Sequence, residues 1–304
     1  MKIALAGFGS VGRYFAEVIG LTSHSLVILT GKRKDYPGHQ HLEQRVTKYT
    51  ADDLESLLED CDAVISTIAG PNDFFVRAHL ALLEACTRSP KCKRFLPSEF
   101  SFNMKDFPDV PSYLSEARIA VRDALRSQQE VKWSIICNGW FMDYLLPSSQ
   151  RYIEDLGPAF AVDANRRAFD YYGDGQAKIS LTSARDTARV VLALIEGSTD
   201  EWTEFSFFSA QTLTWDELYR LLKHHDATYQ RKNVSITQAV QALVESRNED
   251  DRIVADLRIL GFTRAGEIPQ AESLKWNTGI LTSITGRDVD TFLGEAAEHR
   301  DRII

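Results

Sequence analysis

The chain has 304 residues, of which 44% are apolar, and this is enough for one large α/β domain or for two domains of ordinary size. Its formal net charge is −8 and its basic residues are dispersed along the chain, which argues against a nucleic-acid partner. No apolar run approaches the roughly 20 residues that span a bilayer, and no CxxC or cysteine–histidine spacing is typical of a metal site, so we expect a cytoplasmic protein without membrane contact or metal.

A glycine-rich turn follows the first predicted strand, at residues 2–6, and leads into a predicted helix at residues 13–19. It reads GxGxxG, with Gly7 for the tight turn, Gly9 for close approach of a pyrophosphate and Gly12 for strand–helix packing. Unpaired N–H groups at a helix start favour anions. An ordinary strand-to-helix turn is the alternative. The residues predicted to bind a dinucleotide here are Gly7, Phe8, Gly9, Ser10, Val11 and Gly12.

The second predicted strand, at residues 25–29, ends about 20 residues after the glycines, where such folds bind the adenosine ribose. No carboxylate stands at the strand end, and Lys32 and Arg33 follow it. Cations suit a 2′-phosphate, so the sequence favours NADPH over NADH, with a solvated basic loop as the alternative.

Strands and helices then alternate. We predict strands at residues 44–49, 62–68 and 94–96, and helices at residues 52–59 and 74–85. This alternation indicates a doubly wound parallel sheet. The loop after the second of these strands lies at a strand carboxyl end, where ligands bind, so we expect it to form a wall of the cofactor site with Thr67, Ile68, Ala69 and Gly70.

Aromatic residues follow two further strand ends. One group lies in the loop after residues 94–96, and the other follows a strand predicted at residues 132–137, beyond a helix at 113–127. We expect them to face the substrate, although core packing would also explain them. The residues predicted for the substrate site are Phe102, Asn103, Trp140 and Phe141, together with Tyr172 from a later strand.

The pattern of predicted elements changes after residue 156, and the regular alternation of strands and helices ends there. The chain then has shorter predicted strands, a turn at residues 173–175, and helices at residues 186–195 and from residue 215. Thr214 and Glu217 form a capping-box pattern for the latter helix. We therefore expect a nucleotide-binding domain over residues 1–155, with residues 179–198 packing back onto it. Residues 156–304 would form a smaller, mainly helical α/β substrate domain.

Several of these pieces together resemble the NmrA-like and isoflavone reductase-like group of atypical short-chain dehydrogenases. They are the glycine-rich turn, residues 63–68, residues 94–100, and the turn at 173–175 followed by Lys178 and Asp186. The resemblance implies a Rossmann-type domain with a smaller carboxy-terminal domain, a substrate cleft between them and NADPH as cofactor. It also implies that Ser98, Glu99 and Phe100 lie near the nicotinamide.

The sequence departs from this group at a catalytic position. Reductases of the group carry a lysine three residues before a Val-Arg or Ile-Arg pair, and here that position is Arg118, before Val121 and Arg122. A guanidinium stays charged above pH 12 and cannot act as a base, so Arg118 is expected to stabilise negative charge instead. Water, Tyr113, Tyr144 or Tyr172 would then deliver the proton. The group's glycine pattern also begins one residue earlier, where this chain has Ala6.

Three functions agree with these observations. The leading hypothesis is an NADPH-dependent reductase of a small aromatic or conjugated carbonyl-type substrate. A second is a regulatory protein like NmrA, which would bind NADPH without turnover and act through a protein partner. A third is a redox-neutral isomerase or cyclase in which Arg118 polarises a carbonyl group.

Overall fold

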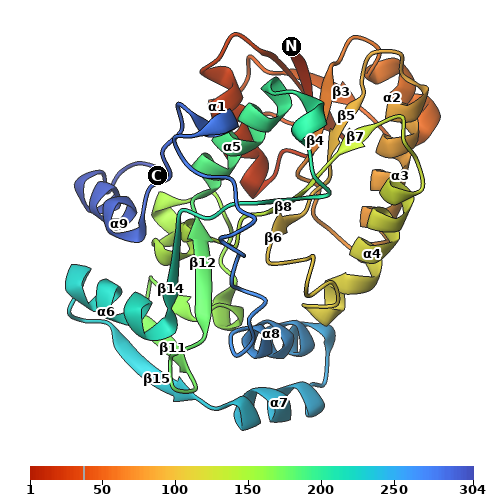
Figure 1. The fold of residues 1–304 in the computed structure, drawn as a ribbon. Coiled ribbons are helices and arrows are strands. Elements are labelled where there is room, and N and C mark those ends of the chain that lie inside the picture. The colour runs from red at the N-terminus through yellow and green to blue at the C-terminus, as the bar shows by residue number, and fades with distance from the viewer. Residues whose placement is uncertain (37) are drawn as a thin grey trace. The chain divides into compact units, whose positions relative to one another are not determined.

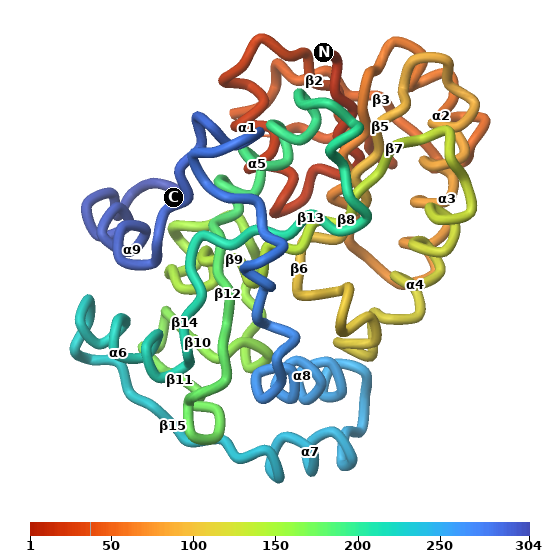
Figure 2. The backbone as a smooth tube through the Cα atoms, viewed as in Figure 1, coloured from red at the N-terminus to blue at the C-terminus, as the bar shows by residue number. Residues whose placement is uncertain are grey.

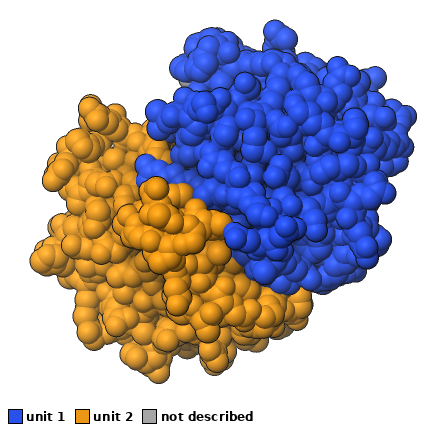
Figure 3. Space-filling model, turned by 45° about the horizontal axis from the view of Figure 1, so that its top comes forward, with its two compact units in different colours: residues 1–99, 116–136, 188–206 blue, residues 100–115, 137–187, 207–304 orange. Residues whose placement is uncertain are grey.

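The computed structural model describes residues 1–36 and 38–304. The chain forms two compact units, which Figure 3 colours separately. The first contains residues 1–99, 116–136 and 188–206, and the second contains residues 100–115, 137–187 and 207–304. Residues 100–115 and 137–155, which we expected in the nucleotide-binding domain, belong to the second unit. Segments that follow strand carboxyl ends therefore supply part of that unit.

A parallel sheet of six strands forms the centre of the first unit, in the order β3-β2-β1-β4-β5-β7 (Figure 1). Residues Ala63–Ser66 of the fourth strand are all fully buried, which explains why that strand reads as a continuous apolar run. This topology confirms the predicted doubly wound sheet. The strands are β1 (Lys2–Ala6), β2 (Ser25–Thr30), β3 (Glu43–Val46), β4 (Ala63–Ser66), β5 (Arg94–Leu96) and β7 (Lys132–Trp133).

Helices cover both faces of this sheet. Helix α1 (Ser10–Gly20) lies on one face, and α2 (Ala51–Leu57), α3 (Asn72–Arg88) and α4 (Ser112–Arg126) lie on the opposite face (Figure 1). Right-handed crossovers require this division, because the chain moves one way along the sheet from β1 to β3 and the other way from β3 to β7. Helix α5 (Ala184–Glu196) returns to the first unit from residue 188, where Glu196 bonds His24 at 2.6 Å.

The second unit combines short strands with helices, and its chain path can be followed in Figure 2. Two three-stranded sheets have the orders β10-β11-β15 and β14-β12-β9. Helix α6 begins with the predicted capping box, because Thr214 accepts from the Glu217 N–H at 3.1 Å and donates its own N–H to the Glu217 carboxylate at 2.8 Å. The remaining elements are β6 (Phe100–Ser101), β8 (Ile135–Cys137), β9 (Trp140–Phe141), β10 (Val162–Asp163), β11 (Ala168–Tyr172), β12 (Lys178–Thr182), β13 (Phe205–Phe207), β14 (Gln211–Thr214), β15 (Gln230–Val234), α6 (Trp215–His225), α7 (Ile236–Val244), α8 (Glu249–Leu260) and α9 (Val289–Glu298).

Short 3₁₀ turns connect several of these elements, at Met142–Leu145, Ser148–Gln150, Gly157–Ala159, Thr199–Glu201 and Gly279–Leu281. Within residues 1–36 and 38–304, no helix has both the length and the apolar character needed to cross a bilayer. The four cysteines are free thiols and all are buried.

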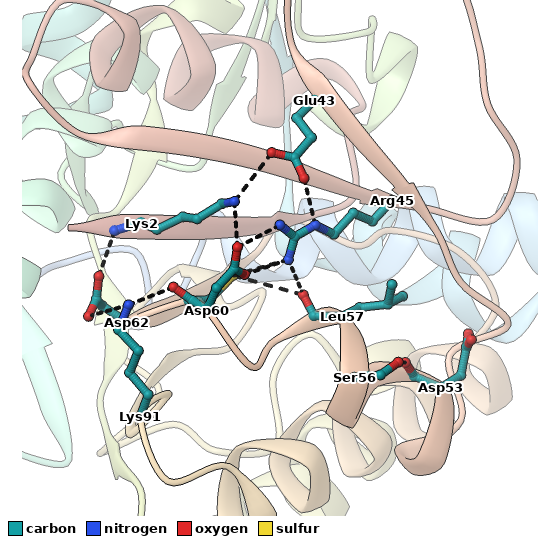
Figure 4. Close-up of polar contacts among 10 residues, drawn as sticks. Lys2, Glu43, Arg45, Asp53, Ser56, Leu57, Asp60, Asp62 and Lys91 are labelled. Carbon is teal, nitrogen blue, oxygen red and sulfur yellow. Dashed lines mark hydrogen bonds and ion pairs between the residues drawn. The ribbon is translucent and has the colours of Figure 1, made fainter.

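An ion-pair network joins the amino ends of three strands, at the end of the sheet away from the glycine-rich turn (Figure 4). Asp60 accepts hydrogen bonds from Lys2 at 2.6 Å and from both terminal nitrogens of Arg45 at 2.7 and 2.9 Å. Glu43 pairs with the same two cations, at 3.3 Å from Lys2 and 2.8 Å from Arg45. The Arg45 guanidinium holds the pKa of Asp60 well below its usual range.

Replacing Asp60 by asparagine should therefore lower the free energy of unfolding at pH 7 by about 1 kcal/mol, the scale of a partly exposed ion-pair network. A carboxyl group whose pKa is lowered by folding stabilises the native state above its unfolded pKa of about 4, and this stabilisation disappears as the pH falls through the native pKa. Urea unfolding should thus give a difference between variant and parent that shrinks from pH 7 to about pH 3. An equal difference at both pH values would contradict the network's role. Asp109→Asn, at an exposed position, should change stability by less than about 0.5 kcal/mol.

Candidate functional site

The glycine-rich turn lies where the strand order of the sheet reverses. β1 pairs with β2 on one side and with β4 on the other, so the carboxyl ends of β1 and β4 meet. There the Thr67 N–H donates to the Ala6 carbonyl at 2.8 Å, and the Thr67 hydroxyl donates to the Gly7 carbonyl at 2.9 Å. Open α/β sheets bind ligands at this switch point. The structure therefore brings the loop after β4 against the glycine-rich turn.

The three glycines of the turn have different surroundings. Gly7 has a φ of +91°, and a Cβ there would lie 3.1 Å from the Thr67 backbone. A Cβ on Gly12 would lie 2.8 Å from the Thr67 hydroxyl oxygen and 2.9 Å from the Gly7 carbonyl oxygen. A Cβ on Gly9 would meet no described atom within 4 Å. Gly7 and Gly12 thus permit close packing, whereas Gly9 leaves open space at the amino end of α1, beside N–H groups that suit an anion.

The loop after β2 carries the two predicted cations on the surface. Lys32 and Arg33 are both exposed. The Thr30 hydroxyl donates to the Lys32 carbonyl at 3.0 Å, and Gln44 of β3 bonds the Lys34 backbone in both directions, at 3.1 and 2.8 Å. These bonds hold the loop against the strand ends, and the exposed Arg33 guanidinium also donates to the Gln44 carbonyl at 3.4 Å.

The loop after β4 leads directly into α3. Ile68 is buried, whereas Ala69 and Gly70 are exposed before Pro71, the residue that precedes the helix. Gly70 has a φ of +142°, a conformation that side chains rarely adopt. The exposed part of this predicted cofactor wall is therefore backbone and one methyl group.

Glu99, predicted to lie near a nicotinamide, is held by a buried ion pair. Arg122 of α4 donates to the Glu99 carboxylate from Nε at 3.0 Å and from Nη2 at 2.6 Å, and both side chains are at most 2% exposed. The Arg122 Nη1 is buried and has no hydrogen-bond partner among the described residues. The Glu99 side chain thus joins the segment after β5 to α4. Ser98 is half-buried, and Phe100 begins β6 in the second unit.

His79 orders the same segment, and the sequence pattern did not point to it. Its Nε2 accepts from the Ser98 backbone N–H at 3.1 Å, so Nδ1 carries the proton and donates to the Phe75 carbonyl at 2.7 Å. Burial lowers the pKa of His79 to about 3, and the imidazole is neutral. The signal in the sequence was a single histidine on the apolar face of the helix predicted at 74–85.

Arg118 lies against an aromatic ring. Its guanidinium carbon is 3.3 Å from the centroid of the Phe75 ring, and the His79 imidazole lies 3.8 Å from the same ring. Asp123, further along the same helix, pairs with Arg126 at 2.9 Å. Arg118 therefore has its guanidinium over an aromatic ring, on the same helix as Arg122 and one turn before it.

The second unit contains an aromatic cavity of about 140 Å³. The Trp140 ring lies 4.8 Å from that of Phe102 and 4.9 Å from that of Phe160. Burial raises the pKa of the Tyr144 phenol, which is therefore protonated at neutral pH. The residues predicted for the substrate or for proton delivery that line this cavity are Phe102, Tyr113, Trp140, Phe141 and Tyr144, and its other walls are Phe100, Ser101, Pro111, Leu114, Gly139, Leu156 and Leu257.

Gly139 makes this arrangement possible. Its φ is +74°, and a Cβ there would overlap the Ser180 carbonyl of β12. The chain can therefore bring Trp140 and Phe141 alongside β12 as strand β9. The Trp140 side chain is 6% exposed, and its indole N–H has no hydrogen-bond partner among the described residues.

Two residues predicted for the substrate site are not part of the cavity wall. Asn103 forms a local turn, in which its amide donates to the Asp106 carboxylate at 2.9 Å and accepts from the Asp106 N–H at 3.2 Å. Tyr172 is buried between Trp215 and Phe262, with ring centroids 5.1 and 5.2 Å away. The structure therefore does not bring Asn103 or Tyr172 to the aromatic cavity. Within the described residues, no group of histidine, cysteine and acidic side chains has the arrangement of a metal site.

Comparison with curated proteins identifies the family. The chain is 34% identical over 271 residues to the oxidoreductase swnR of Arthroderma benhamiae, covering 89% of each protein, and 30% identical to the swnR of Metarhizium robertsii over the full length of both. An isoflavone reductase homolog A622-like protein of Nicotiana tabacum is 25% identical over 207 residues, which cover 64% of this chain and 63% of that protein. The chain belongs to the NmrA-like and isoflavone reductase-like family. No family model matches the chain.

Solved structures of this family share the fold. Leucoanthocyanidin reductase from Vitis vinifera, in a binary complex with NADPH, superposes with a TM-score of 0.76 at 18% identity, covering 97% of this chain and 99% of that one. An isoflavone reductase superposes with a TM-score of 0.71 at 18% identity, covering 97% and 98%. The family fold therefore extends over nearly the whole chain.

The Glu99–Arg122 pair leads to a stability prediction. Arg122→Met removes one partner and leaves the Glu99 carboxylate buried and unpaired, which should lower the free energy of unfolding by about 3–5 kcal/mol. Adding Glu99→Leu removes that charge and should recover a large part of the loss. Urea unfolding of both single variants and the double variant provides the measurement. If the losses in the single variants simply add, the two side chains are not coupled.

Proposed function

We propose that this protein is an NADPH-dependent reductase of a small aromatic or conjugated carbonyl-type substrate. The observation that carries the proposal is the open amino end of α1 at the switch point, where Gly9 leaves room beside the first N–H groups of the helix. The names of the curated relatives and the NADPH complex of the Vitis vinifera reductase support it.

We assign most of the cofactor site to residues of the first unit. Residues 7–12 would hold the pyrophosphate, Lys32 and Arg33 the 2′-phosphate, and residues 67–70 one wall of the site. We place Ser98, Glu99 and Phe100 near the nicotinamide, with Glu99 acting through its ion pair rather than by direct contact. When bound, NADPH supplies the hydride.

The aromatic cavity of the second unit is our candidate for the substrate site. Its walls carry aromatic and aliphatic side chains and no charged one, which suits a flat, neutral molecule. Trp140 contributes its ring to these walls, and its indole N–H is buried. Asn103 and Tyr172 lie outside the cavity wall, so we do not assign them to the substrate.

Arg118 and the tyrosines are our candidates for charge stabilisation and for proton transfer. Arg118 would stabilise the negative charge that develops on the acceptor when hydride is added, a role that needs a permanent cation and no titration. Tyr113 and Tyr144 are the proton donors that we prefer over Tyr172, because both line the cavity. The Tyr144 phenol carries its proton at neutral pH, although burial raises its pKa and makes it a weaker acid.

Incubation of the purified protein with NADPH and a panel of enones, aryl ketones and quinone methides tests the proposal, with absorbance followed at the nicotinamide band. Oxidation of NADPH by one class of panel member is the expected result. Conversion of a panel member without NADPH oxidation would favour a redox-neutral isomerase or cyclase. Tight NADPH binding with no conversion at all would favour a regulatory protein, which the arginine at position 118 also suits.

The loop after β2 leads to a prediction about nucleotide preference. Lys32 and Arg33 should make NADPH bind more tightly than NADH by about 1–3 kcal/mol, the scale of one or two charge-assisted hydrogen bonds. Lys32→Ala/Arg33→Ala should remove the preference while retaining NADH binding. Titration calorimetry with both nucleotides gives the two affinities. Lys48→Ala/Lys275→Ala removes the same charge at two other exposed positions and should leave the preference intact. Equal affinities of the parent protein for NADPH and NADH would overturn the assignment of Lys32 and Arg33 to the 2′-phosphate.

A second prediction concerns Arg118. Arg118→Ala should lower kcat by about 10²–10³, the range for loss of one oxyanion donor. Arg118→Lys should recover only part of this activity, because an ammonium does not stack on Phe75 as a planar guanidinium does. Arg126→Ala, on the same helix and in surface ion pairs, is the matched control and should leave kcat unchanged. Full turnover in Arg118→Ala would exclude a catalytic role for this residue.

A further inference from the structure

Helix α7 exposes a continuous apolar stripe. The Ile236, Val240 and Val244 side chains are 55%, 44% and 79% exposed, whereas Ala239 faces inward and is buried. Residues four apart differ by about 40° around a helix, so these three form one row along its surface. None of the nine residues of α7 is charged. Depletion of charge around exposed aliphatic side chains is typical of the core of a protein interface.

The two ends of this stripe carry opposite charges. α7 connects the edge strand β15 to α8, along which it packs (Figures 1 and 2). Before the helix, Arg231 and Lys232 are exposed. After it, residues 245–252 contain four acidic and two basic side chains. The stripe is therefore basic at its amino end and acidic at its carboxyl end.

We propose that α7 is a dimer interface, which docks in antiparallel orientation on α7 of a second copy of this chain. In a two-fold interface the same surface meets itself in reverse, so an axis at Val240 places the amino end of one helix beside the carboxyl end of the other. Lys232 and Glu249 lie at similar distances along the chain from Val240, on opposite sides of it. The antiparallel arrangement thus pairs opposite charges, and a parallel one would oppose like charges.

The size of the stripe sets the strength of this dimer. A helix of nine residues is about 14 Å long, so this contact buries much less than the roughly 800 Å² per partner of a standard interface. A weak dimer that dissociates on dilution is the expected state. Lys232 also disfavours edge-to-edge pairing of β15 between two copies, as charged side chains on edge strands commonly do. Of these two neighbouring elements, α7 is therefore the one that we assign to the contact.

Sedimentation velocity of the full chain between about 1 and 200 μM, a range that brackets a weak dimer, tests the proposal. The parent protein should shift from monomer towards dimer with concentration. Val240→Lys should remain monomeric throughout, with an unchanged Tm, because the substituted side chain is on the surface. Gln241→Lys adds the same charge at the next position, outside the stripe, and should dimerise as the parent does.

A charge reversal separates the antiparallel dimer from a parallel dimer and from a dimer formed through a different surface. Lys232→Glu should weaken dimerisation at least tenfold, and adding Glu249→Lys should restore it. A parent protein that is monomeric at all concentrations, or a dimer that survives Val240→Lys, would overturn the proposal. Binding of the monomer to phosphatidylcholine or phosphatidylserine vesicles that is lost in Val240→Lys would also overturn it and would assign the stripe to a membrane surface.

Discussion

The close approach of two chain segments at the switch point is the constraint on which the rest of the first unit depends. Gly12 packs against the Thr67 hydroxyl, and that hydroxyl bonds the Gly7 carbonyl, so β1, α1 and β4 are held together within a few ångströms. Any side chain at Gly7 or Gly12 would push these elements apart. Because they are held so closely, the amino end of α1 lies at the edge of the sheet with open space beside Gly9.

Much of this arrangement could be predicted because it follows from local rules. The spacing of Gly7, Gly9 and Gly12 between an apolar run and a helical pattern predicts a turn of this kind. The topology of a doubly wound sheet then predicts which loops lie at its carboxyl edge. The capping box at Thr214 was likewise predictable, since its two residues are three positions apart. In each case the partners are close in sequence or are fixed by topology.

The interactions that order the segment after β5 were not predictable in this way. Glu99 and Arg122 are 23 positions apart, and charged residues are rarely buried, so neither suggested an internal pair. His79 contacts Ser98 through a backbone group that has no signature in the sequence. In the second unit, Tyr172 and Trp140 both lie near strand ends, but the packing of each ring depends on the pairing of short strands, such as β9 with β12. Sequence patterns do not determine such pairings when strands have only two to five residues.

The repeated passage of the chain between its two units has a consequence for biosynthesis. Residues 188–206 belong to the first unit although 67 residues of the second, 100–115 and 137–187, are made before them. During synthesis on the ribosome, the six-stranded sheet can be assembled well before the segment from residue 188 arrives to cover it. A fragment that ends near residue 155 would lack this segment and would leave apolar side chains of the first unit exposed. Gene fragments intended to yield a single unit should therefore join separate stretches of the chain rather than truncate it at one position.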